Sequence, residues 1–515
     1  MASLATTGRD CGTKSVWLDG VELPETPALD RDVTADVCIV GAGIAGITTA
    51  YLLARQGRSV VVIDDKSPLG TGGQTSRTSG HLSAALDDGF AVLEQLHGHQ
   101  GARLAAESHA AAIDRIEAIC EREAIRCDFR RVDEFLFAPP GYATDELHHE
   151  YAAATRAGLT VDWVPRAPLV FETGPCLRFA RQAQFHALQY LAGLIRAIRR
   201  DGGRIYGATH ADNIEGGAAA RIQTSHGPII TARAVVVATN VPVNDLAVIH
   251  AKQAAYRSYV IAAAVPKGSV THALYSDTAV PYHYVRVQPG EHHDVLIVGG
   301  EDHKTGQSDD TESRWEPLTV WARERFPLMG TVEHHWSGQI VEPIDGLAFI
   351  GNNPMDDGNV YVATGDSGHG LTHGTIAGIL LTDLIQGREN PWQNLYDPSR
   401  RTLRSAMTFA RENANATAQY AKWLGRGDVE SADAIARGQG AVVRRGLRMI
   451  ATYVDDTGAR HECSAACPHL GAVVRWNEAE RSWDCPAHGS RFDPRGRVIE
   501  GPAISDLAMI ADDEP

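Results

Sequence analysis

The chain has 515 residues, of which 43% are hydrophobic and 22% are charged, so it is long enough for two or three structural units and too apolar to be disordered. Its formal net charge of -16 argues against nucleic-acid binding, because that role needs a basic surface. No apolar run approaches the roughly 20 residues that span a bilayer, and the N-terminal stretch lacks the apolar core of a signal peptide. We therefore expect a cytoplasmic protein with no nucleic-acid partner and no membrane span.

A dinucleotide-binding pattern stands near the front of the chain, where residues 36–64 read DVCIVGAGIAGITTAYLLARQGRSVVVID. An apolar strand leads into Gly41-x-Gly43-x-x-Gly46, and an apolar helix and a β-branched strand follow. The three glycines permit a tight turn, the approach of a pyrophosphate, and close packing of helix on strand. Asp64, at the end of the second strand, has the offset of an acid that accepts hydrogen bonds from a ribose. The pattern predicts a βαβ unit that binds either NAD or FAD.

Two cysteine–histidine pairs stand near the other end, Cys467-x-His469 and, after fifteen intervening residues, Cys485-x-x-His488. Two thiolates and two imidazoles can hold a tetrahedral zinc ion. The loops that carry them, CPHLG and CPAHGS, resemble instead those of a Rieske domain, in which two Cys bind one iron of a [2Fe-2S] cluster and two His bind the other. The resemblance covers about residues 430–510 and implies that these four side chains are the metal ligands.

The Rieske resemblance also bears on the reduction potential. The high-potential members of that family have two further cysteines, which form a disulfide between the cluster loops. Ala472 and Ala487 stand at those places in this chain. The resemblance therefore implies a lower potential.

The cluster indicates which dinucleotide binds at the front. A Rieske centre passes one electron at a time, whereas organic substrates give up two electrons as a hydride, and a flavin handles both. No second dinucleotide pattern is found for a nicotinamide, since GDSGHG at 365–370 has a different spacing. No histidine follows His488 to build the mononuclear iron site of a Rieske oxygenase. FAD is therefore the expected dinucleotide, with electrons entering from a small organic substrate.

Residues from about 33 to 400 resemble the D-amino-acid-oxidase-like flavoproteins, which include sarcosine and glycine oxidases. The matching pieces are the Gly41 turn, GGQTSRTSGHLS (72–83), RAVVVATN (233–240), WSGQ (336–339), GLAFIG (346–351) and VYVATGDSGHGLTHGT (360–375). Arg77 stands where some relatives attach FAD to a histidine, so FAD is expected to be bound non-covalently. The candidate cofactor-binding residues are Gly41, Gly43, Gly46, Asp64, Ser76, Arg77, Thr78, Ser79, His81, Gly365, Gly368, Gly370 and Leu371.

Two helices are expected to begin beside the cofactor. The strand Asn359–Ala363 leads through a glycine-rich turn into a helix from about Leu371 to Gln386, whose first N–H groups would face the flavin. The segment from Ser76 to His81 is expected to begin the other helix.

Two expected strands, YRSYVIAA (256–263) and PYHYVRVQ (281–288), alternate like a sheet with one buried face. This alternation directs His283 and Val285 to one side and Tyr284 and Arg286 to the other. In the resembling family such a sheet covers the flavin, so one of these faces is expected to line the substrate pocket. The alternative is that the aromatic side chains are sheet core. The candidate catalytic residues are His369, His283 and Arg286.

The expected architecture is an α/β (α+β) FAD-binding fold interleaved with a mixed-sheet substrate domain (33–424), preceded by an extension (1–32) and followed by a linker and an all-β Rieske domain (425–515). We expect an FAD-dependent dehydrogenase that takes a hydride from a small amine, amino acid or alcohol and passes electrons singly to the cluster and an external acceptor. Thr372 stands where sarcosine oxidases have a lysine for the substrate carboxylate, so carboxylate binding is not implied. The alternatives are an oxygen-using oxidase with an accessory Rieske domain, or a redox sensor without turnover.

Overall fold

The computed structural model describes residues 13–66, 72–244, 249–307, 314–354, 356–401 and 405–510. Its helices are α1 (Ile44–Ala54), α2 (Phe90–Glu123), α3 (Asp145–Ala157), α4 (Ala187–Arg200), α5 (Trp315–Arg325), α6 (Gly370–Ile385), α7 (Gln393–Tyr396) and α8 (Ala406–Ala418). Within these ranges, none of the helices combines the length and the apolar character that crossing a membrane requires.

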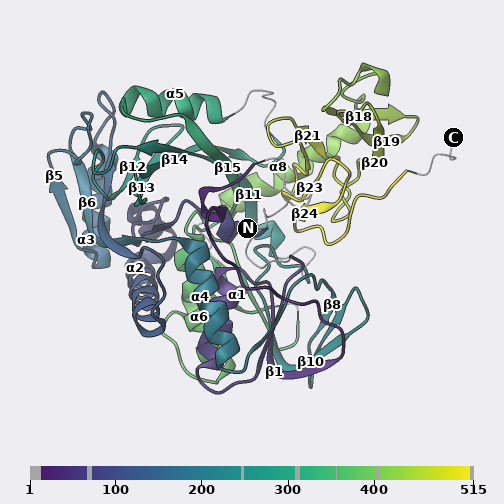
Figure 1. The fold of residues 1–515 in the computed structure, drawn as a ribbon, viewed down its shortest axis with the longest axis horizontal. Helices are drawn as coiled ribbons and strands as arrows, with labels where there is room; N and C mark the ends of the chain where they lie inside the picture. The colour runs from purple at the N-terminus through teal and green to yellow at the C-terminus, as the bar shows by residue number, and fades with distance from the viewer. Residues whose placement is uncertain are drawn as a thin grey trace.

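The first sheet is built around parallel strands. Its strand order is β16 (Phe349–Asn352), β17 (Val360–Thr364), β10 (Ile229–Val237), β1 (Val33–Val40), β2 (Val60–Ile63) and β7 (Arg204–Tyr206), with β9 (Ala220–Thr224) and β8 (Ala211–Glu215) added beside β10. The central strands are buried over most of their length, as parallel strands covered on both faces are. Helices α1, α4 and α6 pack together beside this sheet (Figure 1). The carboxyl ends of β1, β2, β10 and β17 therefore meet at one edge, where the Gly41 turn begins.

The second sheet is mixed. Its strand order is β15 (Val332–Pro343), β11 (Gln253–Val265), β14 (Asp294–Lys304), β13 (His283–Gln288), β12 (Leu274–Asp277), β4 (Arg130–Phe137), β6 (Cys176–Gln184) and β3 (His81–Leu82), and β5 (Val161–Val164) pairs with β6. All of these pairs are antiparallel except β12 with β4. Helix α5 covers one face and buries Trp315 and Leu318 against it. The strands predicted around 256–263 and 281–288 are thus present as β11 and β13.

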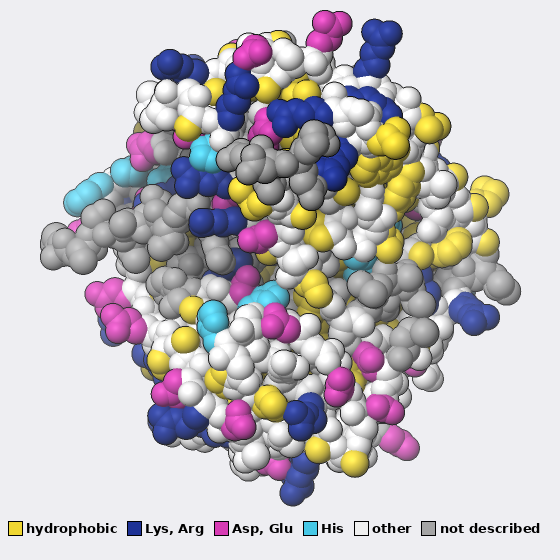
Figure 2. Space-filling view, turned by 90° about the vertical axis from the view of Figure 1, so that its right-hand side faces the viewer, with side chains coloured by type: hydrophobic (Ala, Val, Ile, Leu, Met, Phe, Trp, Pro, Cys, Tyr) yellow, Lys and Arg dark blue, Asp and Glu magenta, His cyan; other side chains and the backbone are white. Residues whose placement is uncertain are grey.

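The C-terminal region (residues 425–510) contains only short strands and turns. One small sheet consists of β18 (Gly440–Arg445), β19 (Arg448–Val454) and β20 (Arg460–Ser464), and the other of β21 (Arg475–Asn477), β22 (Ser482–Asp484), β23 (Arg491–Phe492) and β24 (Val498–Glu500). Their core includes Trp483 and Phe492, both fully buried. This region lies beside β11 and α8 (Figure 1). On the face of the molecule that includes it, acidic and basic side chains are interspersed (Figure 2).

Helix α8 and the 3-10 turn η5 (Gln419–Leu424) lead into the C-terminal region. The hydroxyl of Tyr420 donates to the carbonyl oxygen of Leu470 at 2.9 Å, and Trp423 Nε1 donates to that of Gly471, also at 2.9 Å. This connecting segment therefore holds the first cysteine–histidine loop by its backbone.

The helix predicted to begin between Ser76 and His81 is absent. A 3-10 turn, η2 (Gln74–Ser76), precedes β3, which begins at His81. Gly80 between them has φ of +80°, and a Cβ there would lie 2.4 Å from Nη1 of Arg286. The buried arginine occupies the space beside this turn, and the positive φ ends any helical continuation.

Candidate active site and cluster site

The first glycine-rich turn follows β1. Gly41 has φ of +104°, and a Cβ there would lie 2.4 Å from the carbonyl oxygen of Ala238. A Cβ on Gly46 would lie 1.9 Å from the carbonyl oxygen of Gly41, so the third glycine lets α1 pack on the turn. Gly43 lines a cavity, and the atom nearest to a Cβ there would be Thr75 Oγ1 at 3.4 Å. The protein thus leaves open the space at Gly43 that a pyrophosphate would fill.

Asp64 follows β2 and lines the same cavity. Its carboxylate accepts hydrogen bonds from the backbone N–H groups of Ala42 (2.7 Å) and Lys66 (2.9 Å). Burial, with the charge of Asp65 beside it, raises the pKa of Asp64 to about 6. The carboxylate is therefore fixed next to the glycine turn, at the place that the sequence pattern assigns to a ribose.

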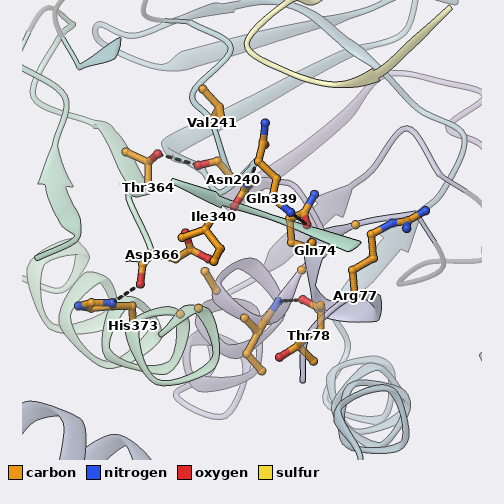
Figure 3. Close-up of a pocket in the computed structure, with 18 of the residues that line it drawn as sticks. Gln74, Arg77, Thr78, Asn240, Val241, Gln339, Ile340, Thr364, Asp366 and His373 are labelled. Carbon is orange, nitrogen blue, oxygen red and sulfur yellow. Dashed lines mark hydrogen bonds between the residues drawn. The ribbon is translucent and has the colours of Figure 1, made fainter. Parts of the chain in front are cut away.

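The cavity runs from the Gly41 turn to the mixed sheet. Figure 3 shows Gln74 and Thr78 on one side of it, Asp366 and His373 on the other, and Gln339 between them. The candidate residues in its lining are Gly41, Gly43, Asp64, Arg77, Thr78, Ser79, His81, Gly365, Gly368, His369, Gly370 and Leu371. Those outside its lining are Gly46, Ser76, His283 and Arg286. The fold thus brings the two glycine-rich turns, far apart in sequence, to one site.

The second glycine-rich turn joins β17 to α6. Gly365 and Gly368 have φ of +78° and +75°, which favours glycine at both positions. Asp366 Oδ1 accepts the backbone N–H of Val341 at 2.9 Å, and its carbonyl oxygen accepts a hydrogen bond from His373 Nδ1 at 2.8 Å (Figure 3). These bonds tie the turn to β15 and to α6, and place the N-terminus of α6 at the cavity wall.

His369 lies at the start of α6 and faces several carboxylates. Its Nε2 accepts the backbone N–H of Asp87 at 3.0 Å and lies 3.3 Å from the carboxylate of the same residue. Burial lowers the pKa of the imidazole, but Asp87, Glu134 and Asp88 outweigh burial, so the pKa of His369 is raised. His369 thus lies beside a group of carboxylates at the substrate-domain end of the cavity.

Two of the three candidate catalytic residues lie away from the cavity. His283 Nδ1 is 3.1 Å from Asp277 Oδ2, and its ring stacks on Trp321 with 4.2 Å between centroids, on the α5 side of the mixed sheet. Arg286 is fully buried and donates to the carbonyl oxygen of Gly80 at 2.6 Å. Both side chains bond to protein groups outside the lining and support the sheet.

The sequence analysis does not single out several side chains that line the substrate-domain end of the cavity: Glu134, Ser258 and Tyr282. Tyr284, which the alternation along 281–288 places opposite His283, lines it as well. Tyr282 stands two residues before Tyr284, so the same alternation predicts that its side chain points to the same side of the sheet. Glu134 stands in the apolar strand VDEFLF, and an inward-facing charge in such a strand is the signal for it.

The four cysteine and histidine side chains of the C-terminal region converge. The sulfur atoms of Cys467 and Cys485 are within hydrogen-bond distance of each other, and the ring centroids of His469 and His488 are 5.0 Å apart. Backbone N–H groups that follow each cysteine point at its sulfur, which stabilises a thiolate. The two short loops therefore present two sulfur and two nitrogen donors to one place.

The donor set fits a two-iron cluster. Nδ1 of His488 is buried and has no hydrogen-bond partner among the described residues, as expected of an atom that binds iron. No group of three or more His, Cys, Asp or Glu side chains suited to a single ion occurs in the described ranges, and a Rieske centre needs none, because each iron takes two protein ligands.

A histidine from outside the C-terminal region sets the tautomer of one ligand. His250, in the turn η3 (His250–Lys252), lies with Nε2 3.2 Å from the carbonyl oxygen of Pro242 and Nδ1 3.0 Å from His469 Nε2. A carbonyl oxygen only accepts, so Nε2 of a neutral His250 carries the proton and Nδ1 accepts from His469 Nε2. His469 then presents a deprotonated Nδ1, which is the form that binds a metal.

The C-terminal region also forms part of the wall of the nucleotide cavity. Its residues in the lining are Val498, Ile499, Glu500, Gly501, Ala503 and Ile504. Gln339 of β15 lines the cavity and donates from Nε2 to the carbonyl oxygen of Gly489, next to His488, at 2.8 Å. A Cβ on Gly489 would lie 2.2 Å from Cβ of Ala255, so the second cluster loop packs directly on β11.

A buried ion network joins the C-terminal region to β11. Arg257 has no exposed side-chain surface, and its guanidinium lies 2.7 Å from Glu480 and 2.8 Å from Glu500. Arg491 lies 3.1 Å and 3.4 Å from the same two carboxylates. Burial raises the pKa of each glutamate, but the two arginines outweigh burial and lower both pKa values to about 2. Arg491 also pairs with the buried Asp484 at 2.9 Å. The low pKa values keep both glutamates ionised at neutral pH.

The family model described as DAO, FAD dependent oxidoreductase, matches residues 36–384. The chain belongs to this family of FAD-dependent oxidoreductases. The model of the Rieske [2Fe-2S] domain matches residues 426–511. The predicted family, cofactors and fold class are thereby confirmed: this is an FAD-dependent oxidoreductase with a Rieske domain that binds a [2Fe-2S] cluster.

One similar protein matches nearly the full length of the chain. The chain is 34% identical over 502 residues to YhfW of Bacillus subtilis, which is named as a Rieske 2Fe-2S iron-sulfur protein. The match covers 96% of this chain and 97% of YhfW. The chain is 27% identical over 419 residues to the gamma-glutamylputrescine oxidoreductase of Escherichia coli, covering 74% of this chain and 92% of that protein. The glycine oxidase of Geobacillus kaustophilus has the same fold, with a TM-score of 0.61 and 20% identity over 72% of this chain and 99% of the oxidase.

Proposed function

We propose that this oxidoreductase is a dehydrogenase for a small amine or amino-acid-like compound, and that its electrons leave through the Rieske cluster to an external acceptor. The observation that carries the proposal is the shared wall: Glu500 and its neighbours in the Rieske domain line the cavity that begins at Gly41. The names of two similar proteins, a glycine oxidase and a gamma-glutamylputrescine oxidoreductase, support an amine or amino acid as substrate.

The proposed reaction balances as follows. A carbon–nitrogen unit CH–NH gives up a hydride from carbon and a proton from nitrogen and becomes an imine, and water then splits the imine into a carbonyl compound and an amine. FAD supplies the hydride acceptor and can release electrons singly, and the cluster carries one electron at a time. Two single transfers to the external acceptor therefore match each substrate oxidised.

The chain's own residues bind and orient in this scheme. The two glycine-rich turns hold the dinucleotide between them, and β11, β13 and β15 cover it from the substrate side. His369 positions the loop at Asp87 by accepting its N–H. Gln339 lines the cavity and also donates to the second cluster loop, so this one side chain spans the two cofactor sites. Orientation of this kind contributes to rate without requiring a strong base.

The proposal is tested by anaerobic mixing of the loaded protein with amines, amino acids and alcohols, following flavin absorbance and the EPR signal of the reduced cluster together. We expect one class of compound to bleach the flavin, after which the cluster signal grows. Cys485→Ser should still show flavin reduction but no cluster signal and no reduction of an added acceptor. Cys463→Ser is the matched control, because Cys463 is a buried non-ligand cysteine of the same domain.

Two outcomes would contradict the proposal. Peroxide formed in proportion to substrate consumed, with the cluster remaining oxidised, would show an oxidase with an accessory Rieske domain. A flavin that no compound bleaches would show a redox sensor. The FAD content of Cys485→Ser is measured alongside, because the Rieske domain forms part of the FAD cavity.

A further inference from the structure

The substrate-domain end of the cavity is acidic. Asp87, Glu134 and Asp366 contribute carboxylates to its lining. Apart from histidines, the basic residues among the described residues of the lining are Lys66 and Arg77. Lys66 follows β2 and pairs with its neighbour Asp65 at 2.7 Å, and Arg77 donates toward Thr13 and the carbonyl oxygen of Ser337, so both belong to the dinucleotide side.

Glu134 is the carboxylate best placed to meet a ligand. It lies on β4, is only 8% exposed, and lines the cavity. Its Oε2 accepts the hydroxyl of Ser83, whereas Oε1 has no hydrogen-bond partner among the described residues. Burial raises the pKa of Glu134 to about 7, Asp87 adds to the rise, and Ser83 and His369 oppose it. A buried carboxylate with an open acceptor oxygen lacks the partner that such groups normally have.

Aromatic rings stand around the same space. Tyr282 and Tyr284 line the cavity, and the ring of His81 meets that of Tyr284 edge-on at 5.5 Å. Burial lowers the pKa of His81 to about 3, so its ring adds no charge at neutral pH. Neutral rings beside carboxylates attract an organic cation through their π faces.

Two residues that could have bound a substrate carboxylate, Arg286 and the residue at position 372, are bonded to other protein groups. Arg286 of β13 lies outside the cavity lining. It donates to the carbonyl oxygens of Gly80 and Phe185 and to the side chain of Gln288. Thr372 is buried in α6 and its hydroxyl is bonded to the ring of His109. Neither residue presents a cation to the cavity.

We propose that this end of the cavity binds a cationic amine without a carboxylate on the carbon to be oxidised, with Glu134 as its counter-ion and Tyr282 and Tyr284 as its aromatic surround. This inference rests on the proposed function, since it names the substrate class of the same site. A positively charged nitrogen fills the open acceptor of Glu134, and an added carboxylate would face Asp87 and Glu134, with neither lysine nor arginine among the described residues at this end.

A binding measurement tests the recognition without turnover. The loaded protein is titrated with benzyltrimethylammonium, which has no C–H next to a neutral amine to give up, and with benzoate, and the shift of the flavin absorbance spectrum is recorded. We expect the cation to bind and benzoate to bind at least about tenfold more weakly. Glu134→Gln keeps the side-chain shape and should weaken cation binding about tenfold or more. Glu121→Gln removes one charge from an exposed position of α2 and should leave binding unchanged.

Turnover then separates the inference from the proposed function. Matched pairs that differ by one carboxylate are mixed anaerobically with the protein: tyramine and tyrosine, cadaverine and lysine, benzylamine and phenylglycine. Bleaching of the flavin by the amines and not by their amino acids supports the inference. Faster bleaching by the amino acids, or tighter binding of benzoate, overturns it and leaves a dehydrogenase. Cation binding that Glu134→Gln abolishes, without bleaching by any compound, supports the recognition site and rejects the dehydrogenase.

Tyr284→Leu is a second variant for the case in which Glu134→Gln does not fold. It removes one ring from the aromatic surround and leaves the carboxylate in place. Its affinity for benzyltrimethylammonium should fall severalfold, about what a desolvated cation–π contact contributes. Unchanged affinity in a variant with full FAD content would overturn the aromatic part of the site.

Discussion

Replacing Arg257 by Met is expected to detach the Rieske domain from the flavin site. Methionine keeps much of the apolar stem but removes the charge, so Glu480 and Glu500 retain only Arg491 as a cationic partner in the network. The two carboxylates are buried, with 0% and 5% of their side-chain surface exposed. Removing one partner of a buried ion pair costs about 3–5 kcal/mol, because the remaining charge is left in a poor solvent.

The lowered pKa of Glu480 shows how much the whole network contributes to folding free energy. Burial raises this pKa, and Arg257 and Arg491 together bring it from its ordinary 4.5 to about 2. That difference corresponds to about 3 kcal/mol of folding free energy at neutral pH. Because the folded pKa lies below the unfolded one, the contribution is complete above about pH 4.5 and is lost as the pH falls toward 2.

The assay is thermal and urea unfolding of the FAD- and cluster-loaded protein, followed by visible circular dichroism of the cluster and by flavin fluorescence. We expect Arg257→Met to lower the free energy of unfolding by about 3 kcal/mol and to weaken its dependence on pH between 4.5 and 2. Arg178→Met is the control, since Arg178 is 39% exposed, pairs with Asp162 at 3.1 Å and should cost less than about 1 kcal/mol. A loss no larger than that of Arg178→Met would refute the reasoning.

Three further predictions follow from the two cofactor sites. Gly43→Ala should fold normally yet purify without FAD, because the new Cβ enters the open space that the pyrophosphate would fill. Gly46→Ala should instead lower the melting temperature, because the new Cβ would lie 1.9 Å from the carbonyl oxygen of Gly41. The cluster should titrate near the lower end of the Rieske range, roughly -150 mV, because Ala472 and Ala487 allow no disulfide between its loops; a potential above about +200 mV would contradict this. The affinity for benzyltrimethylammonium should fall as the pH drops below about 7, because protonation removes the charge of Glu134, and Glu134→Gln should abolish this dependence.

The parts of the site that the sequence predicted are those whose residues are neighbours in the chain. The Gly41 turn, its helix and the strand ending at Asp64 form one βαβ unit, so their spacing alone determines their geometry. The same holds for the two cluster loops, in which each cysteine lies two or three residues from its histidine. These two sites can be predicted from sequence because the short stretch of chain between their residues allows few conformations.

The parts that the sequence could not predict depend on contacts between distant segments. His283 follows the predicted alternation, but which face of β13 meets the cavity is decided by where α5 packs, and α5 packs on the side of His283. In place of the expected helix at Ser76–His81, a turn with Gly80 at φ +80° leads into β3, and Arg286, more than 200 residues away, donates to the carbonyl oxygen of Gly80. Glu134 lies at the cavity because β4 pairs with β12 on one side and with β6 on the other.

The wall that the Rieske domain adds to the FAD cavity changes how the two halves depend on each other. Glu500 both lines the cavity and pairs with Arg257 of β11, so one residue belongs to the flavin site and to the joint between the domains. Separating the Rieske domain would leave cavity surface without cover. Under the proposed function, electrons would therefore pass from the flavin site to the cluster without domain movement, and the external acceptor would come to the protein. Arg257→Met therefore tests more than stability: if the domain is held as described, flavin reduction should persist in this variant while reduction of the cluster slows.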